Sequence, residues 1–390
     1  MRPTTRPCLT PTRPATLACT AFLAVAPMVA PTLAQSDPAP ATPPSPSAPE
    51  APRPNPADAY QQLPEVARQM IDSASGSPST PAAVTPVAHV ETRGTGPKHV
   101  VLVPGIACDW SVWDAFMTRN AERFTMHAVT LPGFAGSAAP PMPDADKTAW
   151  SSDVWMLNAR RAVSAAIASR ELATPPIVVG HSMGAQVALR LATEEPERVS
   201  AVVMVDGFAA WPLTPTPIPL QARQAMVDNQ MAGFFDTQLA ANDAAGLRQM
   251  FRTGVIDAAR AEALVTMSKT TPTEVFKRYF LELVSADHTP GLKTIAKPVL
   301  VMAAVAPAPP PVPPGQPAPP DTRETLRTVW RTQFEGLDRV QLEFIEGARH
   351  FIMDDAPERF DALIATFSDS LKPALPEPAS PEKPSTGGTP

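Results

Sequence analysis

The stretch Ile177-Val178-Val179-Gly180-His181-Ser182-Met183-Gly184-Ala185-Gln186-Val187-Ala188-Leu189 decides how the rest of the chain is interpreted. It begins with β-branched residues typical of a buried strand, and it ends with the alanine content and apolar period of a helix. Between them lies Gly-x-Ser-x-Gly, whose glycines lack the Cβ atoms that would collide across a sharp strand-to-helix turn. A serine on such a turn stands above the sheet, with the N-terminus of the helix directed at developing negative charge. We therefore expect Ser182 to be a nucleophile rather than an ordinary turn serine.

The composition of the chain suits a large α/β protein with appendages. Its 390 residues carry a net charge of -6 and contain no basic block, which argues against a nucleic-acid partner. The 51 prolines are unevenly distributed, so they mark linkers rather than an unusual fold.

Residues 1–34 have the pattern of a secretory signal: early arginines, an apolar run over 15–30, and small residues before Ala34. A short membrane anchor is the alternative, but the apolar run is brief and is interrupted by Pro27 and Pro31. We therefore expect cleavage after Ala34 and a periplasmic or secreted protein that retains no membrane span. Cleavage would also remove two of the three cysteines and leave Cys108 without a partner for an internal disulfide.

The remaining chain divides into a linker, a globular domain and a tail. Residues 35–87 are rich in proline and alanine, and we expect disorder there with a short helix near 57–72. The globular domain is expected over 88–372, and the proline-rich residues 373–390 form a tail that we also expect to be disordered.

Strands alternate with helices in the globular domain, which predicts an α/β fold with a mostly parallel sheet flanked by helices on both faces. The alternation stops at about 211–290, where the pattern is helical only, and this segment is expected to be a cap inserted between two strands. The predicted strands are 89–92, 99–103, 124–131, 177–180, 199–205, 298–303 and 340–345, and the predicted helices are 110–123, 150–170, 321–334 and 357–371, with cap helices at 221–229, 241–251, 258–267 and 273–284.

A serine hydroxyl is a weak nucleophile at neutral pH and needs a base to take its proton. His350 is the best candidate among the six histidines because it follows the final strand, on a loop that can reach back to the serine. His181 is expected to be a packing or shaping residue rather than the base, since adjacent side chains diverge from one turn. The other histidines have no comparable setting: His89, His99, His127 and His288.

A carboxylate should hold the imidazole in the correct tautomer, normally from the loop after strand 298–303. That loop contains no acid before Asp321, which is interpreted as a helix start with a capping-box partner at Glu324. Asp206 ends strand 199–205, so its side chain is expected at the same edge of the sheet as the serine. We therefore predict Asp206 as the acid, with a purely structural role in the next loop as its alternative. The other candidates are Asp321, Asp354 and Asp355.

An acyl-transfer site also needs donors for an oxyanion. The backbone amide of Met183 and that of Ile106, in the loop after the first buried strand, are the predicted donors, and losing one costs about 3–4 kcal/mol in the transition state. Gly105 permits the close approach of this loop. Trp110 and Trp113 follow it and either line an apolar acyl pocket or pack the first helix.

Four segments together resemble the α/β-hydrolase superfamily with a helical cap, over about 88–371: Val103-Pro104-Gly105, Leu131-Pro132-Gly133-Phe134-Ala135-Gly136-Ser137, Gly180-His181-Ser182-Met183-Gly184 and Gly347-Ala348-Arg349-His350-Phe351. Pro104 stands where many members have histidine. The usual acid position is empty, and some members carry the acid after the earlier strand, as Asp206 would. Serine at position 182 resembles esterases and related acyl hydrolases, and argues against haloalkane dehalogenases and epoxide hydrolases.

The expected reaction is the transfer of an acyl group from a small ester-like substrate to water. No metal-ligand spacing, dinucleotide fingerprint or phosphate loop is present in the sequence, so no metal or cofactor is expected. A carbon–carbon bond hydrolase, an amidase and an acyltransferase would share every residue named, and a non-catalytic envelope-binding protein that kept the fold is an alternative of another class. Apolar cap residues favour a hydrophobic acyl group, although they would equally pack a cap: Met226, Met231, Phe234 and Phe235.

Overall fold

The computed structural model describes residues 83–142, 144, 149–214, 216–242, 245–308 and 321–371. The predictions made for 1–34, for residues 35–82 of the linker with its short helix at 57–72, and for 373–390 lie outside these residues. All the helices and strands below belong to one unit, which takes in the described residues from Thr85 onward.

The described residues form one seven-stranded sheet in the order β1-β3-β2-β4-β5-β6-β7. Only the edge strand β1 runs antiparallel to its neighbour, which confirms the predicted mostly parallel sheet. Every residue of β4, β5 and β6 is buried, as β-branched runs covered on both faces should be. The strands are β1 (His89–Arg93), β2 (Lys98–Val103), β3 (Phe124–Thr130), β4 (Ile177–His181), β5 (Ala201–Val205), β6 (Val299–Val305) and β7 (Val340–Glu346).

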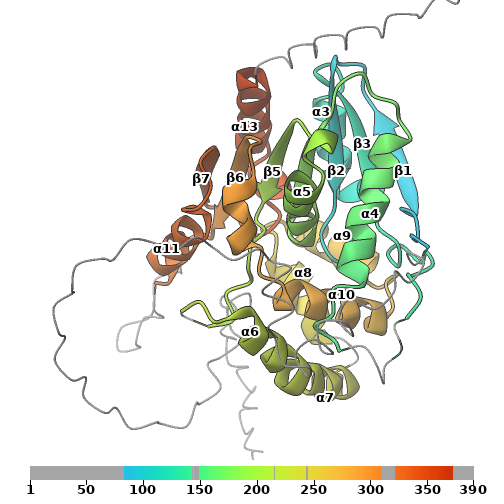
Figure 1. The fold of residues 1–390 in the computed structure, drawn as a ribbon, viewed down its shortest axis with the longest axis vertical. Helices are drawn as coiled ribbons and strands as arrows, with labels where there is room; N and C mark the ends of the chain where they lie inside the picture. Colours follow the sequence, from blue (N-terminus) through green and yellow to red (C-terminus); the bar gives the residue numbers. More distant parts are fainter. Residues whose placement is uncertain are drawn as a thin grey trace, which may run out of the picture. The chain divides into compact units, whose positions relative to one another are not determined.

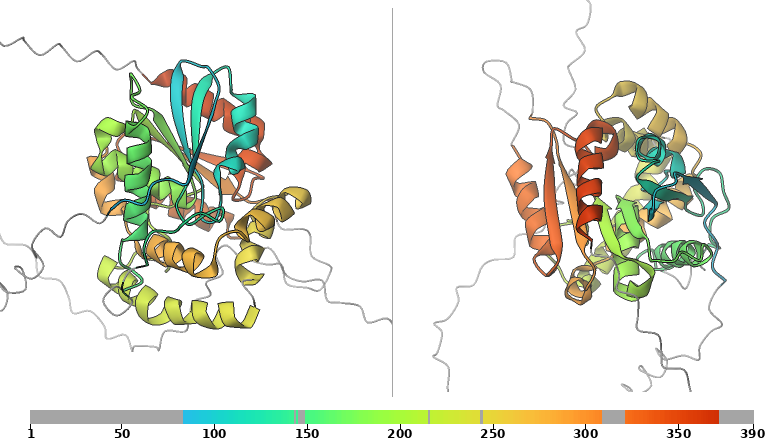
Figure 2. Two further views of the ribbon diagram at one scale, coloured as in Figure 1. Left: turned by 90° about the vertical axis from the view of Figure 1, so that its right-hand side faces the viewer. Right: turned by 90° about the horizontal axis from the view of Figure 1, so that it is seen from above.

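Helices cover both faces of this sheet (Figure 1; Figure 2). On one face α3 (Asp114–Arg119) lies beside α13 (Pro357–Ser370), and Arg119 pairs with Asp361 at 2.6 Å. On the other face α4 (Trp155–Ala168) packs beside α5 (Met183–Glu194). The remaining helices outside the insertion are α11 (Arg323–Phe334), α12 (Ile352–Asp355) and the 3₁₀ turns η1 (Trp110–Trp113), η2 (Pro196–Arg198) and η4 (Thr289–Thr294).

The predicted insertion between β5 and β6 is helical, and Figures 1 and 2 show its helices grouped at one end of the sheet. It has a small apolar core of its own, in which Val227, Leu281 and Val284 are fully buried. Its elements are α6 (Leu220–Met226), the π-helical turn η3 (Val227–Met231), α7 (Ala232–Asn242), α8 (Ala245–Thr253), α9 (Ala258–Ser268) and α10 (Thr273–Ser285).

Contacts with the insertion shift the start of one helix of the sheet domain from the position predicted for it. The helix expected over 150–170 begins only at Trp155, because Ser151 is held by hydrogen bonds of 2.8 and 2.7 Å to the Asp228 carboxylate. The buried Glu282 carboxylate then accepts from the first amides of α4, Trp155 at 2.7 Å and Met156 at 2.8 Å. A carboxylate at the N-terminus of a helix accepts from amides that have no partner in the helix, and it interacts favourably with the helix dipole. The start of α4 is therefore fixed by the position of Glu282 in α10.

Candidate active site

Ser182 lies on the turn that joins β4 to α5, as the sequence predicts. Its backbone has φ of 54° and ψ of -117°, a conformation that non-glycine residues rarely adopt, and its amide donates to Val205 O at 2.8 Å. A Cβ at Gly180 would lie 2.1 Å from Gly184 O, and one at Gly184 would lie 2.4 Å from Val103 O. The two glycines are therefore required by the close approach of backbone around the strained serine.

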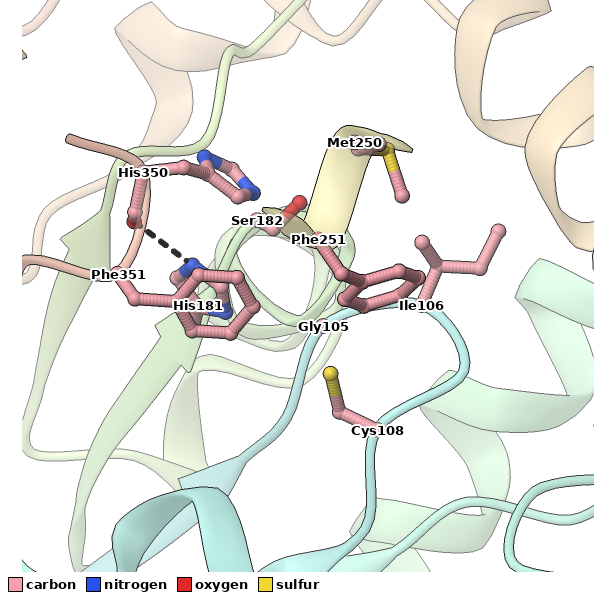
Figure 3. Close-up of a pocket in the computed structure, with 9 residues that line it drawn as sticks. All are labelled: Gly105, Ile106, Cys108, His181, Ser182, Met250, Phe251, His350 and Phe351. Carbon is pink, nitrogen blue, oxygen red and sulfur yellow. Dashed lines mark hydrogen bonds between the residues drawn. The ribbon is translucent and has the colours of Figure 1, made fainter. Parts of the chain in front are cut away.

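His350 and Asp206 are 144 residues apart in the chain and directly bonded in the structure. His350 follows β7, Asp206 follows β5, and Nδ1 of the imidazole lies 2.6 Å from Oδ2 of the carboxylate. The two side chains are 10% and 15% exposed, so the contact is largely shielded from water. A hydrogen on Nδ1 leaves Nε2 as the basic nitrogen, and Figure 3 shows the imidazole directed toward Ser182.

The second oxygen of the Asp206 carboxylate is also held. Oδ1 accepts from the amide of Ala304 at 2.9 Å, and the Asp206 amide donates to Met302 O at 2.8 Å. Asp206 has φ of 45°, which turns its carboxylate back over the end of β6. The loop after β6 therefore contributes a backbone donor that orients the acid, although it carries no acid of its own.

Asp321, the first alternative acid, takes no part in the pocket. Its exposed carboxylate forms hydrogen bonds with the guanidinium and the amide of Arg323, which lower its pKa to about 2. The predicted capping box forms only in part. Asp321 Oδ1 accepts from the Arg323 amide at 3.1 Å, but Glu324 pairs with arginines of its own helix instead of reaching back. Thr322 occupies the N-cap position of α11, and its side chain makes no capping hydrogen bond.

The other two alternative acids join the histidine loop to the insertion. Asp354 pairs with Arg260 of α9 at 2.9 Å. Asp355 accepts from the amides of Ile256 and Arg349, both at 2.8 Å. Both carboxylates are thus engaged in fixing the loop that carries the imidazole.

Two further hydrogen bonds to backbone oxygens complete this junction. The amide of Phe351 donates to Gly254 O, and Nη1 of Arg349 donates to Val255 O, each at 2.9 Å. A Cβ at Gly254 would lie 3.2 Å from the ring of Phe351, so glycine permits the close packing there. The segment that leaves α8 is therefore fixed to the loop that carries His350.

Of the two predicted oxyanion donors, Ile106 lines this pocket, and Met183 directly follows Ser182 in the chain. Met183 is the first residue of α5, where an amide has no acceptor within its own helix. Gly105 and Ile106 line the pocket with Ser182, and Gly105 O accepts from Cys108 N at 3.3 Å. Within the described residues, neither the Met183 amide nor the Ile106 amide donates to another protein group.

The pocket is apolar around these groups (Figure 3), and the empty space among its lining residues measures about 210 Å³, part of which is open solvent at its mouth. Met250 and Phe251 of α8 form the wall that the insertion contributes. Burial raises the pKa of the Cys108 thiol well above its ordinary value, so this cysteine is a neutral wall residue. The residues that line the pocket are Gly105, Ile106, Cys108, His181, Ser182, Met250, Phe251, His350 and Phe351.

The side chains proposed from sequence as contacts for an acyl group are not among these residues. Trp113 is fully buried and stacks on Phe360, which supports the interpretation as core. In the insertion Phe234 is 51% exposed, while Met231 belongs to the small apolar core. Met250 and Phe251 could not be predicted as the wall, because helical periodicity does not say which face of α8 lies against the site.

Over the part of the chain that the structure describes, no group of three or more His, Cys, Asp or Glu side chains is arranged to hold a metal ion. Within the same residues, no helix combines the length and the apolar character needed to cross a membrane.

A mostly parallel sheet with a strained serine at the β4–α5 turn, facing a His–Asp pair, defines an α/β hydrolase with a helical insertion. A model of the alpha/beta hydrolase family matches residues 100–363. The chain belongs to this family.

Relatives and solved structures agree with this assignment. The chain is 35% identical over 117 residues to a pimeloyl-(acyl-carrier protein) methyl ester esterase of Nitrosomonas europaea, covering 30% of this chain and only 40% of that protein. It is 30% identical over 226 residues to the protein of that name from Stenotrophomonas maltophilia, covering 55% of this chain and 76% of the relative. An esterase structure from Thermogutta terrifontis superposes with a TM-score of 0.54 at 18% identity, over 73% of this chain and 93% of that one, which shows the shared fold.

The close approach at the serine turn leads to a test of stability. Gly184→Ala forces backbone apart at the β4–α5 turn, and we expect it to lower the free energy of unfolding by about 3 kcal/mol in urea denaturation. Gly233→Ala is the matched control, because nothing lies within 4 Å of its Cβ in α7, and a gain of about 0.5 kcal/mol is expected there. Equal stabilities of the two variants would contradict the packing described for the turn.

Proposed function

We propose that this protein is a serine hydrolase that cleaves a carboxylic ester through an acyl-enzyme intermediate. The observation that carries the proposal is the 2.6 Å contact between His350 Nδ1 and Asp206 Oδ2, beside a serine held at φ of 54° in the same pocket. A buried imidazole that is oriented by a carboxylate and directed at a strained hydroxyl is the arrangement that acyl transfer requires. The names of the relatives point to the same bond type.

In the proposed mechanism Ser182 Oγ attacks the ester carbonyl while His350 Nε2 takes its proton. Asp206 stabilises the imidazolium that forms, and its contact with the Ala304 amide keeps the carboxylate in place. The amides of Ile106 and Met183 donate to the oxyanion. His350 then protonates the departing alcohol, and a water molecule activated by the same imidazole hydrolyses the acyl-enzyme.

The substrate we propose is a small ester with an uncharged acyl group. The pocket wall is formed mainly by apolar side chains, and no lysine, arginine or carboxylate lines it. Burying an ionised acyl group against that wall would carry a large desolvation cost. A carbon–carbon bond hydrolase, an amidase and an acyltransferase would use the same groups, and the comparison with esterases favours the ester.

The triad assignment predicts an asymmetry between two aspartates. Asp206→Asn removes the charge that stabilises the imidazolium, and we expect kcat on p-nitrophenyl acetate to fall by roughly 10³- to 10⁴-fold. Asp321→Asn is the matched control, since that carboxylate is exposed and bonded to Arg323, and it should leave kcat within about twofold.

The same assignment distinguishes an enzyme from a binding protein that kept the fold. A fluorophosphonate probe should label the wild type and not Ser182→Ala. A wild-type protein that does not react, or an Asp321 variant more impaired than the Asp206 variant, would reject the proposed chemistry.

The wall formed by α8 predicts a change in chain-length preference. Phe251→Ala enlarges the pocket, and we expect kcat/KM for p-nitrophenyl octanoate, relative to the butyrate, to rise by about tenfold. Phe234→Ala in α7 is the control, because its ring is 51% exposed and outside the pocket. An unchanged ratio for Phe251→Ala would show that the acyl group binds elsewhere.

A periplasmic or secreted location belongs to the same proposal and rests on the pattern of residues 1–34. Mass spectrometry of the protein isolated from a bacterial host should find Gln35 at the N-terminus of the mature chain. A protein that keeps Met1 and stays in the cytoplasm would contradict this location.

A further inference from the structure

His181 lies between the serine turn and the histidine loop, and the mechanism above gives it no role. It is the last residue of β4, next to Ser182, and only 1% of its surface is exposed. Its Nε2 lies 3.0 Å from the backbone oxygen of His350 (Figure 3). Since a carbonyl only accepts, Nε2 must carry the hydrogen and donate it.

The opposite edge of the same ring faces the oxyanion loop. A Cβ at Gly105 would lie 3.0 Å from His181 Nδ1 and 3.2 Å from Ser182 Cβ. With the hydrogen on Nε2, Nδ1 is a bare lone pair, and within the described residues it has no hydrogen-bond partner. A buried polar atom without a partner is costly, so its position here needs a reason.

The faces of the imidazole are also occupied. Its centroid lies 4.5 Å from that of the His350 ring and 4.7 Å from that of Phe351, and Trp113 meets it edge-on at 6.4 Å. The ring is therefore enclosed by the general-base loop, the oxyanion loop and the first helical turn. Moving it would disturb all three.

We propose that His181 is a positioning residue: it holds the His350 loop by a hydrogen bond to its backbone oxygen and sets the place of Gly105 by contact. The proposal rests on the proposed function, because the groups it positions are the base and the oxyanion loop of that reaction. A packing residue would act through the volume of its side chain alone. In the role proposed here, the hydrogen bond donated by Nε2 also contributes to activity.

The local electrostatics agree with this role. Burial, and then the neighbouring His350, lower the pKa of His181 well below its ordinary value. His181 therefore remains neutral when His350 takes up the proton of the serine, and it adds no second positive charge beside the imidazolium.

Two variants with side chains of similar length distinguish the effect of the Nε2 hydrogen-bond donor from the effect of side-chain volume. His181→Gln keeps an N–H near the position of Nε2, whereas His181→Met fills similar space without a donor. We expect kcat on p-nitrophenyl acetate to fall by about 10- to 100-fold in His181→Met with KM within about threefold, and to stay within about fivefold of the wild type in His181→Gln. His127→Met is the control: that buried histidine bonds Thr92 on the edge strand, and its loss should affect melting temperature without changing kcat.

Equal kcat in the Gln and Met variants, or a loss that follows melting temperature alone, would overturn the proposal. Should either variant fail to fold, nitrogen NMR of the wild type tests the same point, because His181 must be the neutral Nε2–H tautomer at pH 7. A protonated ring or the Nδ1–H tautomer would also overturn it. Ser182→Ala distinguishes failure of the proposed function from failure of the role given to His181. Full activity in Ser182→Ala would reject the proposed function. An inactive Ser182→Ala together with equal kcat in His181→Gln and His181→Met would reject only the role of His181.

Discussion

The hydrogen bond between His350 and Asp206 is the contact on which the rest of the site depends. It joins the ends of β7 and β5, and it forms only because β6 lies between them in parallel register. The intervening strand supplies both Met302 O for the Asp206 amide and the Ala304 amide for the carboxylate. Three neighbouring strands thus fix one imidazole, and a shift in their register would separate base from acid.

The position of the acid follows from the same geometry. In a parallel sheet the loops after adjacent strands emerge side by side, so a carboxylate after β5 reaches the imidazole as well as one after β6 could. With φ of 45°, Asp206 turns toward β6 and places its two oxygens on different partners. The loop after β6 then needs no acidic side chain, only an amide in the correct place. This explains how a His–Asp pair can form without an acid in that loop.

Patterns among neighbouring residues predicted the sheet, the serine turn and the end of β5 well. Hydrophobic periodicity, the placement of glycines and the ends of strands are all set by residues close together in the sequence. They did not predict contacts between distant segments. From sequence, Met226 and Phe234 could equally contact an acyl group or pack the cap, and the insertion residues that line the pocket are Met250 and Phe251 instead. The sequence-based prediction also began α4 too early, since the carboxylate that accepts from its first amides belongs to α10. Each of these differences arises where the insertion meets the sheet domain, and the orientation of an inserted helix is a tertiary property.

The insertion therefore does more than cover the pocket. Its α8 forms a wall through Phe251, and the residues that follow are bonded to the histidine loop through Gly254 O and the Arg260–Asp354 pair. On the opposite side, the backbone oxygen of His350 is bonded to His181 of the serine turn. The loop with the imidazole is thus held between a rigid strand end and a helical segment that also contacts the substrate space. Movement of α8 would change the shape of the pocket and the anchorage of the His350 loop together, so pocket shape and the position of the imidazole are mechanically linked in this fold.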